Sequence, residues 1–392
     1  MAKIDPTGSA KRPLTQLAQA GRKPSITGPF VNPPVVHAST VLFTEVAAMK
    51  PGGQPYTYGR TGTPTTEALE SAMTELEGAA GTVLCPSGLS AISTALLAVL
   101  GSGDHLLMAD NVYDPARTFA TTMLARLGVE TTFFDPQIGA GVAALMRGNT
   151  RAIYAESPGS LTFELSDLPA LAKAAHEKGA LLVVDNTWAT PFYMKALALG
   201  ADITLLAGTK YIGGHSDVMF GTVSANAAAY PALRETQLTL GLCVGPDDIF
   251  LALRGLRTLG VRLAQHMRSG LTVARFLENR PEVARVLHPA LPNHPGHDLW
   301  RRDMSGSSGL FGVVLDGWST EKTTAFLEAL TIFGLGYSWG GFESLAIPTR
   351  MKRTATDWQA EGPLIRLHVG LEDPDDLIAD LDNAFARVGN LA

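Results

Sequence analysis

A single lysine follows a short apolar segment in the middle of the chain. The segment "ITLLA" covers residues 203–207 and is followed by Gly208, Thr209 and Lys210. An ammonium group at the mouth of a buried strand is costly unless it is solvated, paired with an anion or used in a reaction. A lysine that extends its charged end to the surface is the more common case, so Lys210 alone does not decide between these alternatives.

A carboxylate occupies an equivalent position one strand earlier. Asp185 follows five apolar residues, 180–184. Burial of its charged form is unfavourable unless a cation or several hydrogen-bond donors meet it. Either Asp185 caps a turn, or it balances a positive charge such as the protonated ring nitrogen of a bound cofactor.

A glycine turn before a predicted helix offers an anion site. The segment "PSGLSAIS" places Ser87, Gly88 and Leu89 where a strand ends and a helix begins. Free backbone N–H groups, the helix dipole and the Ser87 hydroxyl would attract a phosphate. The alternative is a plain helix cap, in which Ser87 or Ser90 satisfies the helix end.

If the strands form an open α/β sheet, these three features lie at one edge, because each follows the carboxyl end of a strand. Ligands bind at that edge in such sheets. Pyridoxal phosphate needs a lysine to hold it covalently, an acid opposite its pyridine nitrogen and an anion site for its phosphate. The chain supplies all three in order, so we predict that Lys210 is used chemically and that the cofactor is pyridoxal 5'-phosphate. The residues expected to bring polar side chains or backbone N–H groups to this edge are Ser87, Gly88, Leu89, Glu156, Ser157, Asp185, Thr187, Thr209 and Lys210.

The segments that must position these residues alternate between strands and helices. Short apolar segments such as "DHLLMAD" and "ALLVVDN" are separated by helical patterns such as "TEALESAMTELEG" and "LPALAKAAHEKG". This alternation is typical of an α/β fold with a mainly parallel sheet. A chain of 392 residues is long enough for two domains. We expect an N-terminal arm over residues 1–62, a large domain over 63–250 and a C-terminal domain over 251–392.

The C-terminal domain is expected to contain antiparallel strands. The segment "LIRLHVGLED" places Ile365, Leu367 and Val369 on one face and Arg366 and His368 on the other. That pattern predicts a half-buried strand.

Two helices are predicted to flank this domain. Residues 241–260 become helical and rich in arginine, as a bridge between domains would. Residues 373–388 predict a closing helix in which Asp373 is the N-cap and Pro374 the first helical residue.

The composition excludes several classes of protein. The net charge of −6 argues against nucleic-acid binding, which needs a clustered basic face. Cys85 and Cys243 build neither a disulfide framework nor a metal site, and they favour a reducing cytoplasm. Residues 78–103 carry no charge, but "CPSGLS" interrupts them. We therefore predict a strand, a turn and a helix there instead of a membrane span. The N-terminus has no apolar segment of the kind found in signal peptides.

Other enzyme motifs are missing or unsuitable. No G-x-G-x-x-G follows a strand. His215, Ser216 and Asp217 are adjacent in sequence, so their side chains do not readily converge as a catalytic triad.

Several motifs together resemble one family. The segments "YTYGRTGTPT", "PSGLSAI", "VYDPAR", "VVDNTWATP", "GTKYIGGHSD", "RGLRTLGVRL" and "SWGGFESL" resemble the Cys/Met-metabolism family of pyridoxal-phosphate enzymes, from about Leu14 to the C-terminus. The resemblance implies a type I aminotransferase-like fold. It also implies a homotetramer, built as a dimer of dimers, in which subunits share active sites.

The resemblance implies a role for individual residues. The family's cofactor-binding lysine corresponds to Lys210, and the carboxylate opposite the pyridine nitrogen corresponds to Asp185. The aromatic residue that stacks on the cofactor corresponds to Tyr113. The arginine that binds the substrate carboxylate corresponds to Arg366, assisted by Ser338, and its planar fork suits a carboxylate.

The family's phosphate positions correspond to residues of two subunits. Gly88, Leu89 and Thr209 match positions within one chain. Tyr58 and Arg60 match the pair that reaches the phosphate in the neighbouring subunit, which gives the N-terminal arm a purpose.

Three positions depart from the family pattern. Relatives often have methionine at the position of Leu89, serine at that of Ala207 and asparagine at that of Ser160. The second change can remove one protein hydroxyl that would bind the phosphate. The third leaves open which group bonds to the ring oxygen of the cofactor.

The segment "GLGYSWGGFESL", residues 334–345, carries information on the reaction. Members that act at Cγ usually have a small aliphatic residue after the serine, whereas Trp339 together with "ESPGS" resembles the bacterial cystathionine β-lyases. The resemblance implies β-elimination of L-cystathionine to homocysteine, pyruvate and ammonia. A γ-synthase, a γ-lyase or a broader cysteine-S-conjugate β-lyase is the alternative. Lys210 is expected to be the base, with Tyr113 as the other candidate.

A non-enzymatic use of the same fold is a further alternative, as a regulator or sensor. The chain has no recognisable DNA-binding segment, and an intact set of Lys210, Asp185 and Arg366 would then serve no reaction. An enzyme is therefore the prediction.

Overall fold

Seven strands form the central sheet of this computed structural model, which describes residues 11–389. The strand order is β1-β7-β6-β5-β4-β2-β3. The pairs from β3 to β6 are parallel, and β7 is antiparallel to both β6 and β1. The predicted α/β fold with a mainly parallel sheet is confirmed. The strands are β1 (Gly81–Cys85), β2 (His105–Ala109), β3 (Glu130–Phe134), β4 (Thr150–Glu156), β5 (Leu181–Asp185), β6 (Ile203–Leu206) and β7 (Gly221–Ala225).

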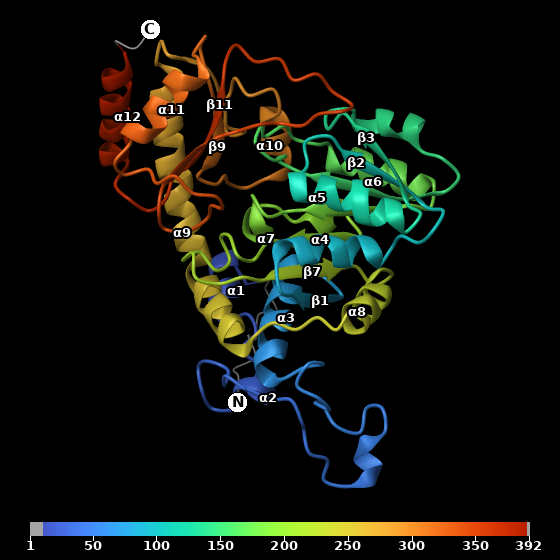
Figure 1. The fold of residues 1–392 in the computed structure, drawn as a ribbon. Helices are drawn as coiled ribbons and strands as arrows, with labels where there is room; N and C mark the ends of the chain where they lie inside the picture. The colour runs from blue at the N-terminus through green and yellow to red at the C-terminus, as the bar shows by residue number, and fades with distance from the viewer. Residues whose placement is uncertain (1–10, 390–392) are drawn as a thin grey trace.

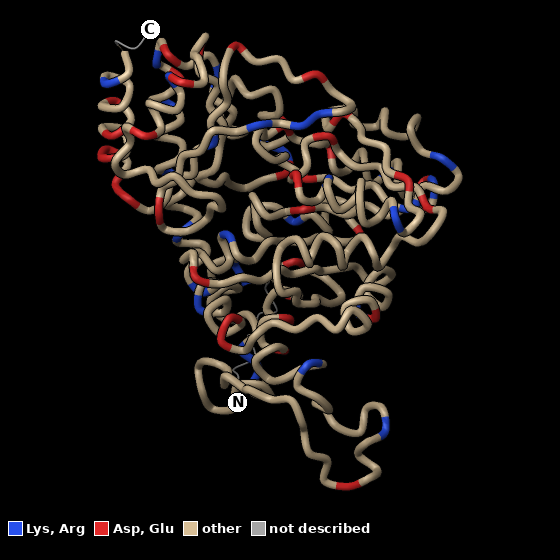
Figure 2. Tube along the Cα trace, viewed as in Figure 1, with Lys and Arg blue, Asp and Glu red and all other residues tan. Residues whose placement is uncertain are grey.

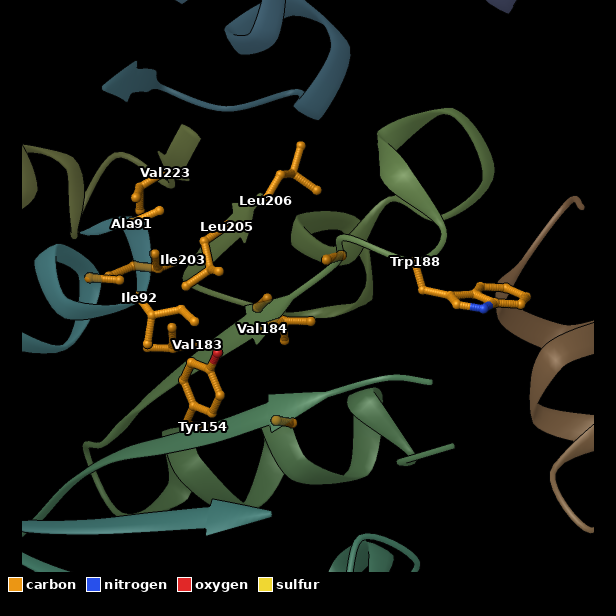
Figure 3. Packing of buried hydrophobic residues seen from close by; sticks show 14 of the residues in the cluster. Ala91, Ile92, Tyr154, Val183, Val184, Trp188, Ile203, Leu205, Leu206 and Val223 are labelled. Atoms are coloured by element: carbon orange, nitrogen blue, oxygen red, sulfur yellow. The ribbon is translucent and has the colours of Figure 1, made fainter. Parts of the chain in front are cut away.

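Helices pack on this sheet through small and aliphatic side chains. Figure 3 shows Ala91 and Ile92 of α4 beside Ile203 and Val223 of the sheet. Close packing of this kind fixes the positions of the strand ends, because few voids remain for side chains to shift into. The helices of this part are α3 (Pro64–Glu77), α4 (Gly88–Leu97), α5 (Asp114–Phe119), α6 (Leu168–Glu177), α7 (Thr190–Tyr193) and α8 (Tyr230–Thr239), with short helical segments η2 (Ala120–Leu124), η3 (Gly139–Leu145) and η4 (Ala196–Leu199).

A second, antiparallel sheet of four strands forms the C-terminal domain, in the order β10-β11-β9-β8. It has its own cluster of buried apolar side chains. The long helix α9 links the two sheets in the chain (Figure 1), as predicted for the bridge. The predicted closing helix is confirmed, and the Asp373 side chain accepts a hydrogen bond from the N–H of Asp375. The elements are α9 (Pro246–Glu278), β8 (Val283–Leu287), α10 (His297–Asp303), β9 (Leu310–Leu315), α11 (Thr320–Ala329), β10 (Leu345–Pro348), β11 (Leu364–His368) and α12 (Pro374–Val388).

Strand β11 differs from its prediction. Both of its faces are buried: Arg366 is 9% exposed and His368 is fully buried. The prediction of a half-buried strand is wrong because its polar face packs against the large domain. The Tyr211 ring lies 6.0 Å from the His368 ring. This face of β11 therefore belongs to the space between the domains, not to the surface.

The N-terminal segment has a docked part and an extended part. Helix α1 (Pro13–Gln19) packs against α9, where Arg257 Nη1 donates to the carbonyls of Leu17 and Ala20 at 2.7 Å each. Helix α2 (Pro24–Thr27) follows, and residues 28–62 then extend away from the body, with only the short η1 (Val46–Met49) between them (Figure 1). Residues 1–10 of the predicted arm and residues 390–392 of the predicted C-terminal domain lie outside the described residues.

The extended segment exposes apolar side chains and little charge. Phe30 is 74% exposed, Leu42 is 85% exposed and Val46 is 82% exposed. Figure 2 shows acidic and basic residues interspersed over the two domains, with few on this segment. Exposed apolar patches of this kind are typical of surfaces that contact another protein.

The uncharged segment 78–103 forms β1, a turn and α4, as predicted. Within residues 11–389, no helix has the length and hydropathy needed to cross a membrane.

Candidate active site

The predicted catalytic side chains converge at the carboxyl ends of β4, β5 and β6. The register of the parallel strands places Glu156 opposite Asp185, and Asp185 opposite Leu205. Lys210 lies in the turn after β6, close enough for its charge to act on Asp185. The prediction that these strand ends meet is therefore confirmed for Asp185 and Lys210.

Lys210 is partly buried, and its environment favours the neutral amine. Burial lowers its pKa to about 8, and the positive charge of Arg366 acts in the same direction, whereas Asp185 opposes the shift. Its Nζ donates to the Ser338 hydroxyl at 2.5 Å and lies 5.4 Å from the centre of the Trp339 ring. A lysine with a pKa near 8 can act as a nucleophile and base near neutral pH.

Asp185 is oriented by its own turn. Its Oδ1 accepts a hydrogen bond from the Thr187 N–H at 2.9 Å and one from the Thr187 hydroxyl at 2.5 Å. The Thr187 hydroxyl in turn accepts from the N–H of Ala207 at 2.9 Å, which ties the turn to the end of β6. Thr187, predicted to contact the cofactor, therefore holds Asp185. Both bonds end on Oδ1 and so fix the orientation of the carboxylate.

A second carboxyl lies beside Asp185. Burial raises the pKa of Glu156 well above its usual range, and the charge of Asp185 raises it further. Burial also raises the pKa of Asp185, but the Thr187 bonds and Lys210 lower it. Two adjacent carboxylates do not both ionise readily, and the bonds from Thr187 favour ionisation of Asp185 over that of Glu156. Glu156 Oε2 also accepts a hydrogen bond from the Tyr113 N–H at 2.7 Å.

From the sequence, Glu156 has no predicted role beyond its place at the sheet edge. The signal was available, because Glu156 follows a buried strand just as Asp185 does. Tyr154 was missed entirely. Its ring lies in the core beside Val183 (Figure 3), and the charge of Asp185 contributes to the rise in its pKa, which burial dominates.

The turn before α4 has the geometry predicted for an anion site. The Ser87 hydroxyl accepts a hydrogen bond from the Ser90 N–H at 3.0 Å and so caps the helix. A Cβ atom on Gly88 would lie 2.5 Å from the Cβ of Ala207, so position 88 must be glycine. The Leu89 side chain is 42% exposed. The predicted cap and the predicted anion site are compatible, because the cap uses only one of the free N–H groups.

Thr209 is already hydrogen-bonded to the backbone. Its hydroxyl donates to the Phe220 carbonyl and accepts from the Phe220 N–H, both at 3.1 Å. In this arrangement Thr209 fixes the start of β7.

Arg366 contacts Ser338, the residue that also accepts a hydrogen bond from Lys210. Arg366 Nη2 donates to the Ser338 carbonyl at 2.8 Å, while its Nε is buried without a hydrogen-bond partner. Burial lowers the pKa of Arg366 to about 10. The cleft between the domains is lined by Glu156, Ser160, Thr187, Trp188, Trp339 and Arg366 among others.

Two predicted residues lie elsewhere in the single chain. Arg60 donates to its own chain's Leu238 carbonyl at 3.0 Å, and Tyr58 is 46% exposed on the extended segment. Neither lines the cleft of its own chain. Tyr113, in contrast, is tied to Glu156 at the sheet edge and is 47% exposed.

The residues present fit pyridoxal phosphate. Among residues 11–389, neither Lys210 nor Arg366 forms an ion pair within 4.0 Å. A buried guanidinium with an unpartnered Nε calls for an anion, because an unpaired buried charge is costly. The site therefore combines a partly buried amine, a carboxylate, a helix N-terminus and an unpaired guanidinium, a set of groups that fits this cofactor and an amino-acid carboxylate.

Comparison with known proteins decides the family. Residues 14–386 match the family described as "Cys/Met metabolism PLP-dependent enzyme". The chain belongs to this family. It is 52% identical to the "Putative cystathionine beta-lyase" of Rhizobium johnstonii, over 95% of both chains. It is 45% identical to "Cystathionine beta-lyase MetC" of Escherichia coli, over 95% of this chain and 98% of that protein.

A solved structure supports the same membership in the Cys/Met-metabolism family. The crystal structure of metB from Corynebacterium glutamicum has a TM-score of 0.90 and 34% identity, over 98% of this chain and all of that chain. The resemblance seen in the sequence motifs is therefore confirmed, and the cofactor is pyridoxal phosphate.

The rate of cofactor loading is expected to report the Lys210 pKa. Only a neutral amine attacks an aldehyde, so the rate at which cofactor-free protein takes up pyridoxal phosphate should rise with pH and level off above about 8. The change in absorbance on mixing, followed between about pH 6 and pH 10, measures this rate. A rate that rises only near 10.5, the value of an ordinary lysine, would contradict the buried environment described for Lys210.

Proposed function

We propose that the protein is a cystathionine β-lyase, which cleaves L-cystathionine with water to homocysteine, pyruvate and ammonia. The observation that carries this proposal is Trp339 in the wall of the cleft, directly after Ser338 and within 5.4 Å of the Lys210 amine. In this family, a tryptophan at that position is typical of bacterial cystathionine β-lyases. The names of the two relatives, at 52% and 45% identity, support the same reaction.

Arg366 and Ser338 are proposed to bind the amino-acid end of the substrate. Arg366 Nε has no partner, and Nη2 is held by the Ser338 carbonyl, so the guanidinium keeps a fixed orientation with a donor free. A carboxylate can accept two parallel bonds from such a fork. This binding places the substrate Cα near Lys210, because Ser338 bonds to both side chains.

Lys210 is proposed to move the protons of the reaction. Bound pyridoxal phosphate supplies an aldehyde for the substrate amine and a ring that stabilises negative charge at Cα. Lys210 Nζ, once neutral, takes the proton from Cα and then donates a proton to the sulfur that leaves Cβ. Asp185 would hold the protonated ring nitrogen, and the two bonds that Thr187 donates to it favour its charged form. The remaining three-carbon enamine hydrolyses to pyruvate and ammonia.

Trp339 is proposed to shield this proton transfer from water. Its ring packs 5.4 Å from the Tyr211 ring and beside the Lys210 amine. Exclusion of water strengthens the electrostatic interactions among Lys210, Asp185 and Arg366. Tyr113, the other candidate for the base, is more exposed and has a pKa raised by burial and by Glu156, which disfavours its anion.

A product assay tests the proposed reaction. Cofactor-loaded protein is incubated with L-cystathionine, and both halves of the cleaved substrate are identified by mass spectrometry. Homocysteine and pyruvate support the proposal. Cysteine and 2-oxobutyrate would identify a γ-lyase, and formation of cystathionine from cysteine and an activated homoserine would identify a γ-synthase. Either result would reject the proposed β-elimination. Cleavage of cystine or other cysteine conjugates in preference to cystathionine would favour the broader β-lyase.

We also propose that the protein is a homotetramer, a dimer of dimers, located in the cytoplasm. The extended segment 28–62 supports shared active sites, since it exposes apolar side chains and carries Tyr58 and Arg60 away from their own cleft. The unpaired thiols of Cys85 and Cys243 are consistent with a reducing compartment.

Mixing two inactive variants is expected to restore activity if active sites are shared. In a mixed dimer of Arg60→Ala and Lys210→Ala chains, one site combines an intact Lys210 with an intact partner Arg60. Activity after co-refolding should therefore exceed that of either variant alone, towards about a quarter of the wild-type value by random assortment of chains. No recovery in mixtures shown by native mass spectrometry to contain mixed dimers would reject the shared site.

A further inference from the structure

We propose that His368 is a positioning residue, which holds the turn Ser338–Gly341 against Lys210 through the N–H of Gly340. We call this segment the active-site turn. The inference rests on the proposed function only in assigning Lys210 and Arg366 their roles. Neither the family comparison nor the sequence motifs point to His368.

The active-site turn lies directly on the backbone of Lys210. A Cβ atom on Gly340 would be 2.9 Å from the Tyr211 nitrogen and 3.1 Å from the Lys210 Cα. Ser338 has a φ of 76° and Gly340 a φ of 85°, so two of its four residues adopt left-handed conformations. A left-handed non-glycine residue persists only where its surroundings enforce it. Contacts from neighbouring residues must therefore hold Ser338 in this conformation.

His368 provides that hold from strand β11. The N–H of Gly340 donates to His368 Nε2 at 3.1 Å. This bond requires Nε2 to be unprotonated, which assigns the ring proton to Nδ1. The Gly341 carbonyl, 3.2 Å from the same Nε2, is then a close neighbour without a hydrogen bond. Burial keeps the pKa of His368 well below its ordinary value, so the acceptor remains available across the neutral range.

The ring itself has little freedom to move. His368 is fully buried and packs 6.0 Å from the Tyr211 ring and 5.4 Å from the His266 ring. Tyr211 also packs 5.4 Å from Trp339. The active-site turn is thus held by His368 at Gly340 and by Tyr211 at Trp339. The rings of Tyr211, His266 and His368 pack against one another, and this buried stack fixes both holding residues.

Ser338 links the active-site turn to both Lys210 and Arg366. Its hydroxyl accepts from Lys210 Nζ and its carbonyl accepts from Arg366 Nη2. A shift of the turn therefore disturbs the proton-transfer group and the carboxylate-binding group together. His368 is two residues from Arg366 on β11, so one strand sets both the guanidinium and the turn that orients it.

Four variants separate positioning from simple stability. His368→Leu removes the acceptor, whereas His368→Gln places an amide oxygen where it can accept the Gly340 N–H. His266→Leu is the matched control, because His266 is equally buried in the same stack and bonds to the Val369 carbonyl instead of the turn. Gly340→Ala displaces the turn while leaving His368 intact, and it serves as the second variant if His368→Leu fails to fold.

The decisive readout is the dissociation constant of glycine, a carboxylate ligand without a leaving group, measured by the absorbance of the cofactor-loaded protein. The constant should rise roughly 10- to 100-fold in His368→Leu and in Gly340→Ala, the loss expected when a binding group moves by about 1 Å. It should return to within about 3-fold of wild type in His368→Gln, and it should rise far less in His266→Leu than in His368→Leu despite a comparable loss of thermal stability. Equal weakening in His266→Leu and His368→Leu, or unchanged binding in Gly340→Ala, would overturn the proposal. Because glycine binding needs no cleavage, a wild-type protein that binds glycine but does not cleave cystathionine would reject the proposed function and leave this test intact.

Discussion

Replacement of Lys210 by alanine is expected to abolish cystathionine cleavage while leaving the fold intact. Lys210 bonds to Ser338 and lies beside Trp339 in the wall of the cleft, and it is proposed to take the Cα proton and to protonate the sulfur. Loss of a positioned acid and base costs roughly 10²- to 10⁴-fold in rate. Loss of the covalent anchor for the cofactor adds to that. Pyruvate formation in a coupled assay measures the effect, and retained turnover would refute the assignment.

Lys195→Ala is the matched control for this experiment. Lys195 is more exposed than Lys210, but burial lowers its pKa as well, and its Nζ donates to the carbonyl of Leu76, which does not line the cleft. Its loss should lower the melting temperature at least as much as Lys210→Ala without removing activity. If both variants lost activity in proportion to their loss of stability, Lys210 would be structural. Partial recovery of Lys210→Ala by an added small primary amine would support the proposed proton transfer directly.

The sequence predicted the chemistry of the site well because that chemistry is local. Lys210 and Asp185 each follow an apolar strand, and parallel strands bring their ends to one edge. Gly88 follows the same logic, since a glycine before a helix leaves N–H groups free for either a cap or an anion. These residues could be found one at a time, and their order in the chain then indicated a single cofactor.

The contacts that orient these residues could not be predicted in the same way. His368 bonds to Gly340, which is 28 residues distant in sequence, and packs under Tyr211, which comes from the other domain. The alternation in "LIRLHVGLED" suggests a solvated face, and only the docking of the two domains shows that this face is buried. Thr187 is similar, because its bond to Ala207 depends on how closely β5 and β6 approach. Periodicity reports the exposure of a single strand but carries no information on what packs against it.

Replacement of Arg366 by leucine is expected to weaken substrate use and to change the ionisation of Lys210. The substrate carboxylate would lose a buried charged partner, which costs about 2–5 kcal/mol, or roughly 30- to several-thousand-fold in kcat/KM. The larger part should appear in KM, because the ground state and the transition state share this contact.

The second effect of Arg366→Leu has a defined sign. The Arg366 charge lowers the pKa of Lys210, so its removal should raise that pKa from about 8. The pH at which cofactor loading accelerates should therefore move upward in Arg366→Leu. Arg366→Lys is the discriminating control, since it keeps the charge but loses the planar fork. It should lose kcat/KM through KM while its loading profile stays near that of the wild type. An unshifted loading profile in Arg366→Leu would show that Arg366 does not act on Lys210 electrostatically, and equal kcat/KM in Arg366→Lys and wild type would show that the fork does not bind the carboxylate.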